Sequence, residues 1–157
     1  MPRLTRNGSG EHSMSSSTGA VDAVTVARLH QLYGRQSHLI DGGDASGWAQ
    51  TFTDDGEFHS PSYPEPVSGA DALIAFAERF HTRARAANEV HRHVITNLVI
   101  DETGDGAATV RAYLQIVATS IGGDSRLGRM TTLTDRVVRV GHRWRIARRD
   151  IRRDDTA

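Results

Sequence analysis

The sequence predicts an α+β fold in which three N-terminal helices pack on one face of a strongly curved antiparallel or mixed sheet. Through the first half of the chain, apolar residues recur at helical spacing. Through the second half, β-branched and other apolar residues alternate with polar ones, in segments separated by Gly and Asp turns. Helices segregated from consecutive strands are typical of an α+β domain, and 157 residues suit one such domain.

The helices are expected in the following order. The first covers residues 21–41 and is stopped by two consecutive glycines. The second covers residues 45–52, with Asp44 as its N-cap and Trp48 on its apolar face. The third begins at Ser68 or Gly69 and runs to about residue 86.

The strands follow from alternation and from turn residues. A short strand over residues 57–59 precedes the third helix and is stopped by three prolines. Four long consecutive strands come after the third helix, over residues 90–100, 107–119, 127–140 and 144–151.

The domain is expected to cover residues 19–153, between tails at residues 1–18 and 154–157. The N-terminal tail is rich in Ser, Gly and Arg, so it cannot bury enough apolar surface to offset the entropy cost of ordering it. Met14 is an alternative first residue of the translated protein. The basic N-terminal residues are not followed by the apolar segment of a signal peptide. No apolar stretch approaches the roughly 20 residues of a membrane span. We therefore expect a cytoplasmic protein without membrane partners.

Charge and cysteine content narrow the function further. The chain has 19 basic and 19 acidic residues, so it lacks the cationic excess of a nucleic-acid binder. It has no cysteine, which excludes disulfides, thiol catalysis and iron–sulfur clusters. A small, roughly neutral ligand is favoured. The eight histidines are many for this length, and histidine is the side chain that titrates nearest neutral pH.

Five segments carry a resemblance to a known family: residues 40–48, which begin IDGGD, 52–58, 69–76, 93–100, which begin HVITN, and 135–146. With the order of elements, they resemble the SnoaL-like polyketide cyclase and dehydratase branch of the nuclear transport factor 2-like superfamily. The resemblance implies a cone-shaped fold that encloses an apolar cavity and a homodimer formed through the sheet. It also implies a hydrophobic small-molecule substrate and catalysis without metal or organic cofactor.

The same resemblance implies the catalytic residues. Asp41 matches an aspartate at the end of the first helix, and His93 matches the histidine that this aspartate orients as a general acid–base. A neighbouring carboxylate fixes the imidazole tautomer and supports its cationic form. Tyr113 aligns approximately with a second catalytic histidine and can donate a hydrogen bond to a carbonyl. A helix-end aspartate, a core histidine and a cross-strand aromatic are the structural alternatives.

Further residues are expected to bind substrate. If His93 faces the cavity, strand alternation puts His91 and Asn97 on the same face, and the sequence leaves open which histidine points inward. Other expected cavity residues are Tyr33, His38, Trp48, Phe58, His59, Phe76 and Phe80. The His91-x-His93 pair could bind a metal with His59 or Asp41, but two ligands alone are weak evidence, and no metal is predicted.

These observations predict a cofactor-independent cyclase, dehydratase or isomerase for a polyketide-like carbonyl substrate in secondary metabolism. The alternative is a non-catalytic ligand-binding or assembly subunit, because the sequence also resembles the small subunits of ring-hydroxylating dioxygenases. Epoxide opening ranks lower, because it needs several cavity carboxylates and only Asp41, Asp135 and Glu57 are available.

Overall fold

A computed structural model describes residues 21–104 and 106–155, so the expected N-terminal tail and the last two residues lie outside the described part. The elements are α1 (Ala23–Gly42), α2 (Ala45–Ala49), β1 (Phe52–His59), β2 (Val67–Ser68), α3 (Ala70–Ala86), β3 (Glu89–Gly104), β4 (Ala107–Ser120), β5 (Ser125–Val140) and β6 (Arg143–Arg153). The predicted α+β class is confirmed.

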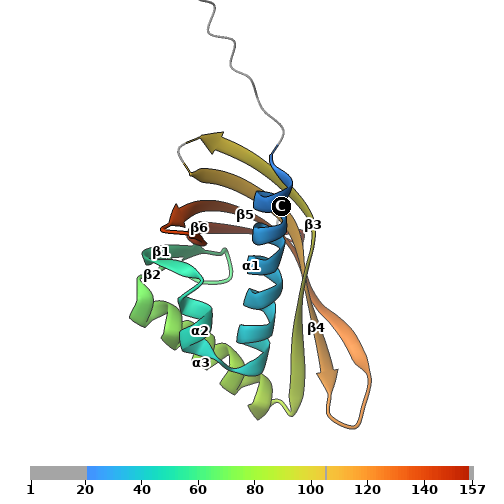
Figure 1. Cartoon of the computed structure of the whole chain (residues 1–157). Helices are drawn as coiled ribbons and strands as arrows, with labels where there is room; N and C mark the ends of the chain where they lie inside the picture. The colour runs from blue at the N-terminus through green and yellow to red at the C-terminus, as the bar shows by residue number, and fades with distance from the viewer. Residues whose placement is uncertain (1–20, 105, 156–157) are drawn as a thin grey trace, which may run out of the picture.

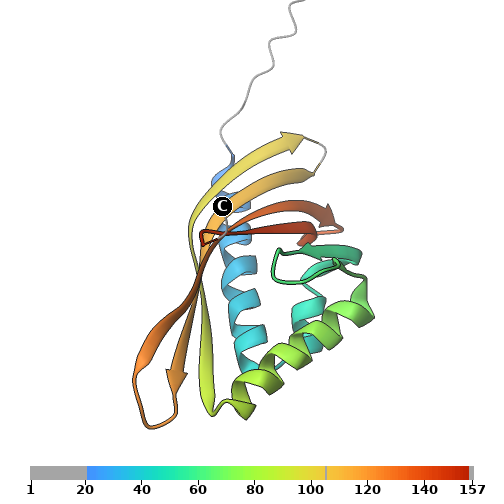
Figure 2. The same ribbon diagram turned by 180° about the vertical axis from the view of Figure 1, so that it is seen from behind.

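The six strands form one sheet in the order β2-β1-β6-β5-β4-β3. Strand β1 runs parallel to β6, and every other neighbouring pair is antiparallel, so the sheet is mixed. Figures 1 and 2 show that the sheet is curved and unclosed, and that the helices lie on one side of it. Helix α1 contacts β3 and β6, and α3 contacts β1, β2 and β3. The hydrophobic core fills the space between these helices and the sheet.

Helix α1 is fixed at both ends by sequence features. At its start, Asp22 accepts hydrogen bonds from the backbone N–H groups of Val24 and Thr25, both at 3.0 Å. At its end, Gly43 adopts a left-handed conformation with φ of 79°, which glycine tolerates without steric cost. This end of the helix holds Asp41 next to β3, where the candidate site lies.

The structure corrects the boundaries around α2 and β1. The helix expected over residues 45–52 ends at Ala49, and Phe52 begins a strand that is much longer than residues 57–59. Phe52 pairs with Ile146 on β6, and Ile146 donates a backbone hydrogen bond to the Thr51 carbonyl at 2.9 Å. Pairing with a strand about 90 residues away thus outweighs local helical spacing. The two-residue strand β2 is absent from the sequence prediction.

A bulge in β3 overturns one expected side-chain orientation. His93 pairs with Ile116 in regular register, but the register shifts between Thr96 and Val99. Asn97 lies within this shift, with φ of 56°, and is exposed. Asn97 therefore does not share the inward face of His93, as strict alternation predicts.

The expected inward position of Tyr113 is also wrong. On β4, Val110, Ala112 and Leu114 are buried, whereas Tyr113 is 47% exposed. Successive residues of a strand point to opposite faces. Tyr113 therefore lies on the outer face of the sheet, away from the helices.

No helix within the described residues is long and apolar enough to cross a membrane.

Candidate active site

Asp41 and His93 form a largely buried pair, as the sequence predicts. His93 Nδ1 lies 2.6 Å from Asp41 Oδ1, and the two side chains are each 9% exposed. The His93 backbone N–H also donates to the same carboxylate, at 3.0 Å to Oδ2 and 3.2 Å to Oδ1. Two donors of one residue, the backbone N–H and the ring Nδ1, therefore fix the carboxylate and the ring relative to each other.

The hydrogen-bond pattern determines which ring nitrogen is available. An ionised carboxylate is only an acceptor, so Nδ1 carries the proton in the hydrogen bond to Asp41. In the neutral ring, Nε2 is then the nitrogen with a lone pair. The Phe80 ring lies 5.0 Å from the His93 ring and restricts its position. The arrangement leaves Nε2 able to exchange a proton with a bound molecule.

His93 lines a pocket between α1, α2, α3 and the concave face of the sheet. The pocket holds about 590 Å³ of empty space, including its open mouth. Its aromatic part comes from Trp48, Phe58, Tyr63, Phe76 and Phe80, and its aliphatic part from Ile40, Ile95, Leu114, Ile116 and Ile151. The polar residues of the lining are Gln36, Ser37, Ser60, His93, Arg129, Thr131 and Arg149. A mostly apolar pocket with a few polar groups is the usual form of a small-molecule site.

Phe76 lies at the centre of the aromatic wall. Its ring stacks on Trp48 at 5.7 Å between centroids, and contacts Phe58 at 4.8 Å and Tyr63 at 5.3 Å. These rings come from α2, α3, β1 and the proline-rich loop that follows β1. Such a wall suits a flat ligand, because aromatic faces offer large apolar contact area.

Gln36 contributes a buried acceptor beside the pocket. Its Nε2 donates to Thr51 Oγ1 at 2.8 Å, and the Thr51 hydroxyl donates to the Trp48 carbonyl at 2.6 Å. Because the hydroxyl proton is used, Thr51 can only accept from Gln36, which fixes the orientation of the amide. Gln36 Oε1 is buried and has no hydrogen-bond partner among the described residues.

A buried ion pair supports the pocket from the β5–β6 side. Arg149 donates to Asp135 through Nε at 2.9 Å and through a terminal nitrogen at 2.7 Å, and the Tyr33 hydroxyl donates to Asp135 at 2.7 Å. Burial and the charge of Asp135 raise the pKa of Tyr33 well above its usual value. For Arg149, burial opposes the charged form, but Asp135 outweighs it and raises the pKa. The buried charges of Asp135 and Arg149 therefore compensate each other, although Arg149 belongs to the arginine-rich strand β6.

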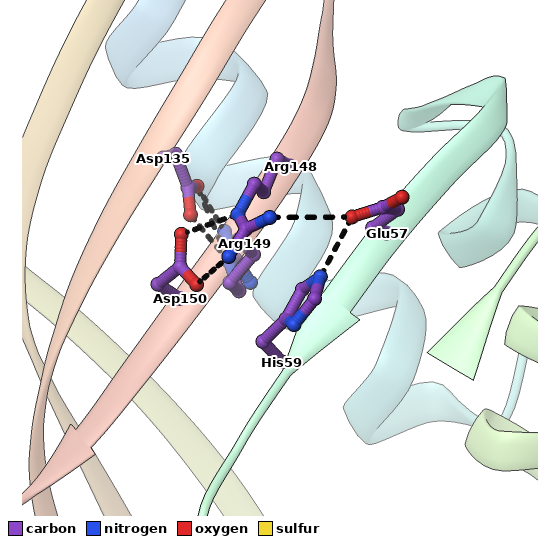
Figure 3. A network of polar contacts seen from close by, with 6 residues as sticks. All are labelled: Glu57, His59, Asp135, Arg148, Arg149 and Asp150. Atoms are coloured by element: carbon purple, nitrogen blue, oxygen red, sulfur yellow. Dashed lines mark hydrogen bonds and ion pairs between the residues drawn. The ribbon is translucent and has the colours of Figure 1, made fainter. Parts of the chain in front are cut away.

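Figure 3 shows the Asp135–Arg149 pair together with a more exposed group on β1 and β6. In that group, His59 Nε2 lies 2.7 Å from Glu57, and Arg148 contacts Glu57 at 3.5 Å and Asp150 at 2.8 Å. His59 lines a separate recess beside the proline-rich loop, not the pocket of His93. The expectation that His59 borders the same cavity is therefore not met.

The remaining predicted residues divide between the pocket and other places. Trp48, Phe58, Phe76 and Phe80 line the pocket with His93. Tyr33 is buried in the core, where it holds Asp135. His91 lies in a neighbouring recess with Asp41, and its Nε2 is 2.8 Å from Glu89. The structure thus puts His93, and not His91, against the pocket.

Three further predicted residues lie away from the pocket and are exposed: His38, Asn97 and Tyr113. His38 is three residues before Asp41, but it projects from the solvent side of α1. Asn97 is displaced by the β3 bulge, and Tyr113 lies on the outer face of β4. The orientation of their side chains, rather than their position along the chain, keeps these residues out of the pocket lining.

Several lining residues were not predicted from the sequence. Tyr63 lies in a proline-rich loop, which the sequence indicates only as the end of a strand. Arg129 and Thr131 lie on β5, and no motif marks them. Their place on the inner face could have been found from alternation with the buried Leu133 and Asp135.

Among the described residues, no three His, Asp or Glu side chains converge as a metal site requires.

Comparison with known proteins agrees with this architecture. The family model of the SnoaL-like domain matches residues 23–150. Aln2 from a Streptomyces species is 28% identical, with a TM-score of 0.81 over 87% of this chain and 96% of its own. ActVI-ORFA from Streptomyces coelicolor is 28% identical, with a TM-score of 0.76 over 84% of this chain and 98% of its own.

A third structure contains a small molecule. A protein from Catenulispora acidiphila in complex with S-DNPA is 32% identical, with a TM-score of 0.75 over 85% of this chain and 96% of its own. No curated protein matches the sequence. The family model covers most of the chain and the similar structures cover nearly all of the described domain. The chain therefore belongs to the SnoaL-like family, the polyketide cyclase and dehydratase branch of the nuclear transport factor 2-like superfamily.

Proposed function

We propose that the protein is a cofactor-independent cyclase, dehydratase or isomerase of secondary metabolism that acts on a polyketide-like carbonyl substrate. The observation that carries this proposal is the largely buried pair of Asp41 and His93, with Nδ1 and Oδ1 2.6 Å apart and the imidazole lining a mostly apolar pocket. His93 is the general acid–base and Asp41 is its positioning partner.

The proposed chemistry is proton transfer beside a carbonyl group. His93 Nε2 takes a proton from the carbon next to the carbonyl, and the imidazolium that forms is stabilised by the Asp41 carboxylate. The same nitrogen then returns the proton to carbon or to a departing hydroxyl. The aromatic wall keeps the flat substrate against His93 and excludes water, which strengthens these electrostatic interactions.

Other polar residues take the place of three that the sequence predicts to contact the substrate. Tyr113, Asn97 and His59 lie elsewhere, whereas the hydroxyl-bearing residues Ser60 and Tyr63 line the pocket. We assign the polarisation of the substrate carbonyl to one of these hydroxyls. Gln36 Oε1, which has no partner in the described part of the chain, can accept a hydrogen bond from a substrate hydroxyl. The small molecule bound by the similar Catenulispora protein supports a small-molecule ligand here.

We also propose a cytoplasmic homodimer formed through the outer face of the sheet. Val94, Val99 and Tyr113 are exposed on β3 and β4, with exposed fractions of 37%, 47% and 47%. Exposed apolar residues grouped on one sheet face are typical of an association surface. This arrangement leaves the concave face and its pocket free for the substrate.

The positions of the acidic residues favour acid–base chemistry over epoxide opening. Asp135 is held by Tyr33 and Arg149, and Glu57 is paired with His59 and Arg148 outside the pocket. Neither carboxylate is placed to attack or protonate an epoxide beside the aromatic wall. The non-catalytic alternative makes a different prediction, which is that the pocket binds ligands but transfers no proton.

The test measures proton transfer directly. Exchange of the carbon-bound protons beside the carbonyl of 2-tetralone is followed by NMR in D₂O, with the protein as catalyst. We expect exchange above the buffer rate, and a loss of about 10²- to 10⁴-fold in His93→Gln. Asp41→Asn also lowers the rate, because the amide can no longer stabilise the imidazolium.

His38→Gln is the matched control, because it makes the same chemical change at an exposed histidine of α1 that lies outside the pocket. This variant should exchange at the wild-type rate. Unchanged exchange in His93→Gln would remove the proposed mechanism. Binding of 2-tetralone without any catalysed exchange would favour the non-catalytic alternative.

A further inference from the structure

The pocket has an unbalanced charge. Among the described residues, its lining contains two arginines and one histidine but no aspartate or glutamate. The Arg149 charge is compensated by Asp135, and His93 is paired with Asp41, which does not itself line the pocket. Arg129 is the remaining cation, and the pocket provides no carboxylate for it.

Arg129 is partly buried and makes no hydrogen bond or ion pair within residues 21–104 and 106–155. Arg129 interacts electrostatically with Asp155, but that carboxylate is already bound by the Arg153 guanidinium at 2.8 Å. The Arg153 hydrogen bond lowers the pKa of Asp155, and the charge of Arg129 adds to this effect. A partly buried guanidinium without a carboxylate partner is costly, so a ligand anion would relieve it.

The sheet register gives the distance between Arg129 and the acid–base pair. His93 on β3 pairs with Ile116 on β4, and Ile116 pairs with Arg129 on β5. All three residues line the pocket, so they form one row on its sheet wall. Neighbouring strands are about 4.8 Å apart, which puts the backbones of His93 and Arg129 about 10 Å apart. One ligand of two or three fused rings can reach both side chains.

We propose that the substrate is an organic acid, and that Arg129 binds its carboxylate while the ring system lies on the aromatic wall beside His93. This inference rests on the proposed function and names the substrate class. Arginine suits the role because its planar fork of donors matches the two oxygens of a carboxylate. The carboxylate then fixes which end of the substrate enters first, and hence which carbon lies at His93 Nε2.

The experiment compares an acid with a neutral molecule of the same shape. Binding of 2-naphthylacetate and 2-naphthylacetamide is measured by calorimetry at neutral pH. We expect the wild type to bind the acid roughly 10- to 100-fold more tightly than the amide. Arg129→Gln should bind both equally, and Arg129→Lys should keep part of the preference, because lysine retains the charge but not the fork.

Arg136→Gln is the matched control. Arg136 lies on the same strand, is exposed and does not line the pocket, so this variant has the same change of charge and should keep the wild-type preference. An unchanged preference in Arg129→Gln, or none in the wild type, would overturn the proposal. Tighter binding of 2-naphthyl phosphate than of 2-naphthylacetate would overturn the carboxylate assignment and favour a phosphorylated ligand.

The two proposals fail separately, because the naphthyl probes do not react. If 2-tetralone exchange depends on His93 but the acid preference is absent, only the carboxylate assignment is wrong. If the acid preference depends on Arg129 but no exchange occurs, the pocket binds acids without the proposed catalysis. Binding of 2-naphthylacetate to His93→Gln shows whether the pocket remains folded in that variant.

Discussion

At the scale of single residues, burial and not distance distinguishes His93 from the other histidines. The described residues contain three pairs of histidine with carboxylate, at 2.6, 2.7 and 2.8 Å. In two of them the partners are two residues apart on one strand, Glu57 with His59 and Glu89 with His91, and the histidine is 25% and 21% exposed. His93 is 9% exposed, and its partner Asp41 is 52 residues away. Of the three histidines, His93 is the one that lines the aromatic pocket.

The Tyr33 phenol leads to a prediction about alkaline pH. The chain contains no lysine, so its side chains that titrate near pH 10 are tyrosines. Burial raises the pKa of Tyr33 in the folded state, so above about pH 10 the unfolded chain binds fewer protons than the folded one. The free energy of unfolding therefore falls as pH rises. In Tyr33→Phe this fall should be shallower.

Urea unfolding at several values between about pH 8 and pH 11 measures this effect. Tyr113→Phe provides the control, because it makes the same chemical change on the exposed face of the sheet. If Tyr33→Phe lost stability with pH as steeply as the wild type, Tyr33 would not be the group responsible.

At the scale of elements, the β3 bulge decides which residues of that strand reach the interior. Before the bulge His93 and Ile95 line the pocket, and after it Leu98 and Ile100 pack against the core. The extra residue of the bulge therefore moves the inward-facing positions of β3 from odd-numbered to even-numbered residues. The bulge lets one long strand contribute both to the pocket and to the core beyond it.

Substitutions at Asn97 test the backbone of the bulge. With φ of 56°, Asn97 adopts a conformation that costs a β-branched residue about 1–2 kcal/mol and glycine almost nothing. Asn97→Val should therefore lower the free energy of unfolding by about that amount, and Asn97→Gly should leave it near the wild-type value. Urea unfolding of both variants makes the comparison at one exposed position. Equal stability of the two would show that the positive φ is not retained.

At the scale of the whole molecule, the buried network of Tyr33, Asp135 and Arg149 joins α1 to β5 and β6. Arg149 also lies over the Tyr33 and Phe52 rings, at 5.8 Å from each centroid. A buried charge that is paired and fully hydrogen-bonded is tolerated, but the same charge alone is costly. The network therefore makes the position of the helix on the sheet depend on all three residues.

Removing one charge of this network should strongly destabilise the fold. Arg149→Met leaves the Asp135 carboxylate buried without its cation, and we expect a loss of about 3–5 kcal/mol in the free energy of unfolding. The double variant Asp135→Leu with Arg149→Met should recover part of this loss, because neither charge remains. Arg148→Met removes only the exposed ion pairs that the neighbouring arginine makes with Glu57 and Asp150, so it should change stability little. A double variant no more stable than Arg149→Met would contradict this account.

The sequence by itself determined the α+β class, the order of the long elements, the family and the pairing of Asp41 with His93. It could do so because helical spacing, strand alternation and turn residues are local, and because Asp41 and His93 lie in segments that resemble the family. It also identified the aromatic wall, since Trp48, Phe76 and Phe80 lie on the apolar faces of their helices.

Only the tertiary structure decided which polar residues accompany that pair. The β3 bulge turned Asn97 outward, the pleat of β4 put Tyr113 on the far face, and the pairing of β5 with β4 and β6 brought Arg129 and Arg149 to the pocket. These outcomes depend on register between strands that are distant in sequence, and a shift of one residue exchanges the two faces of a strand. Local pattern cannot determine that register, because it arises from burial of the complete sheet against the helices.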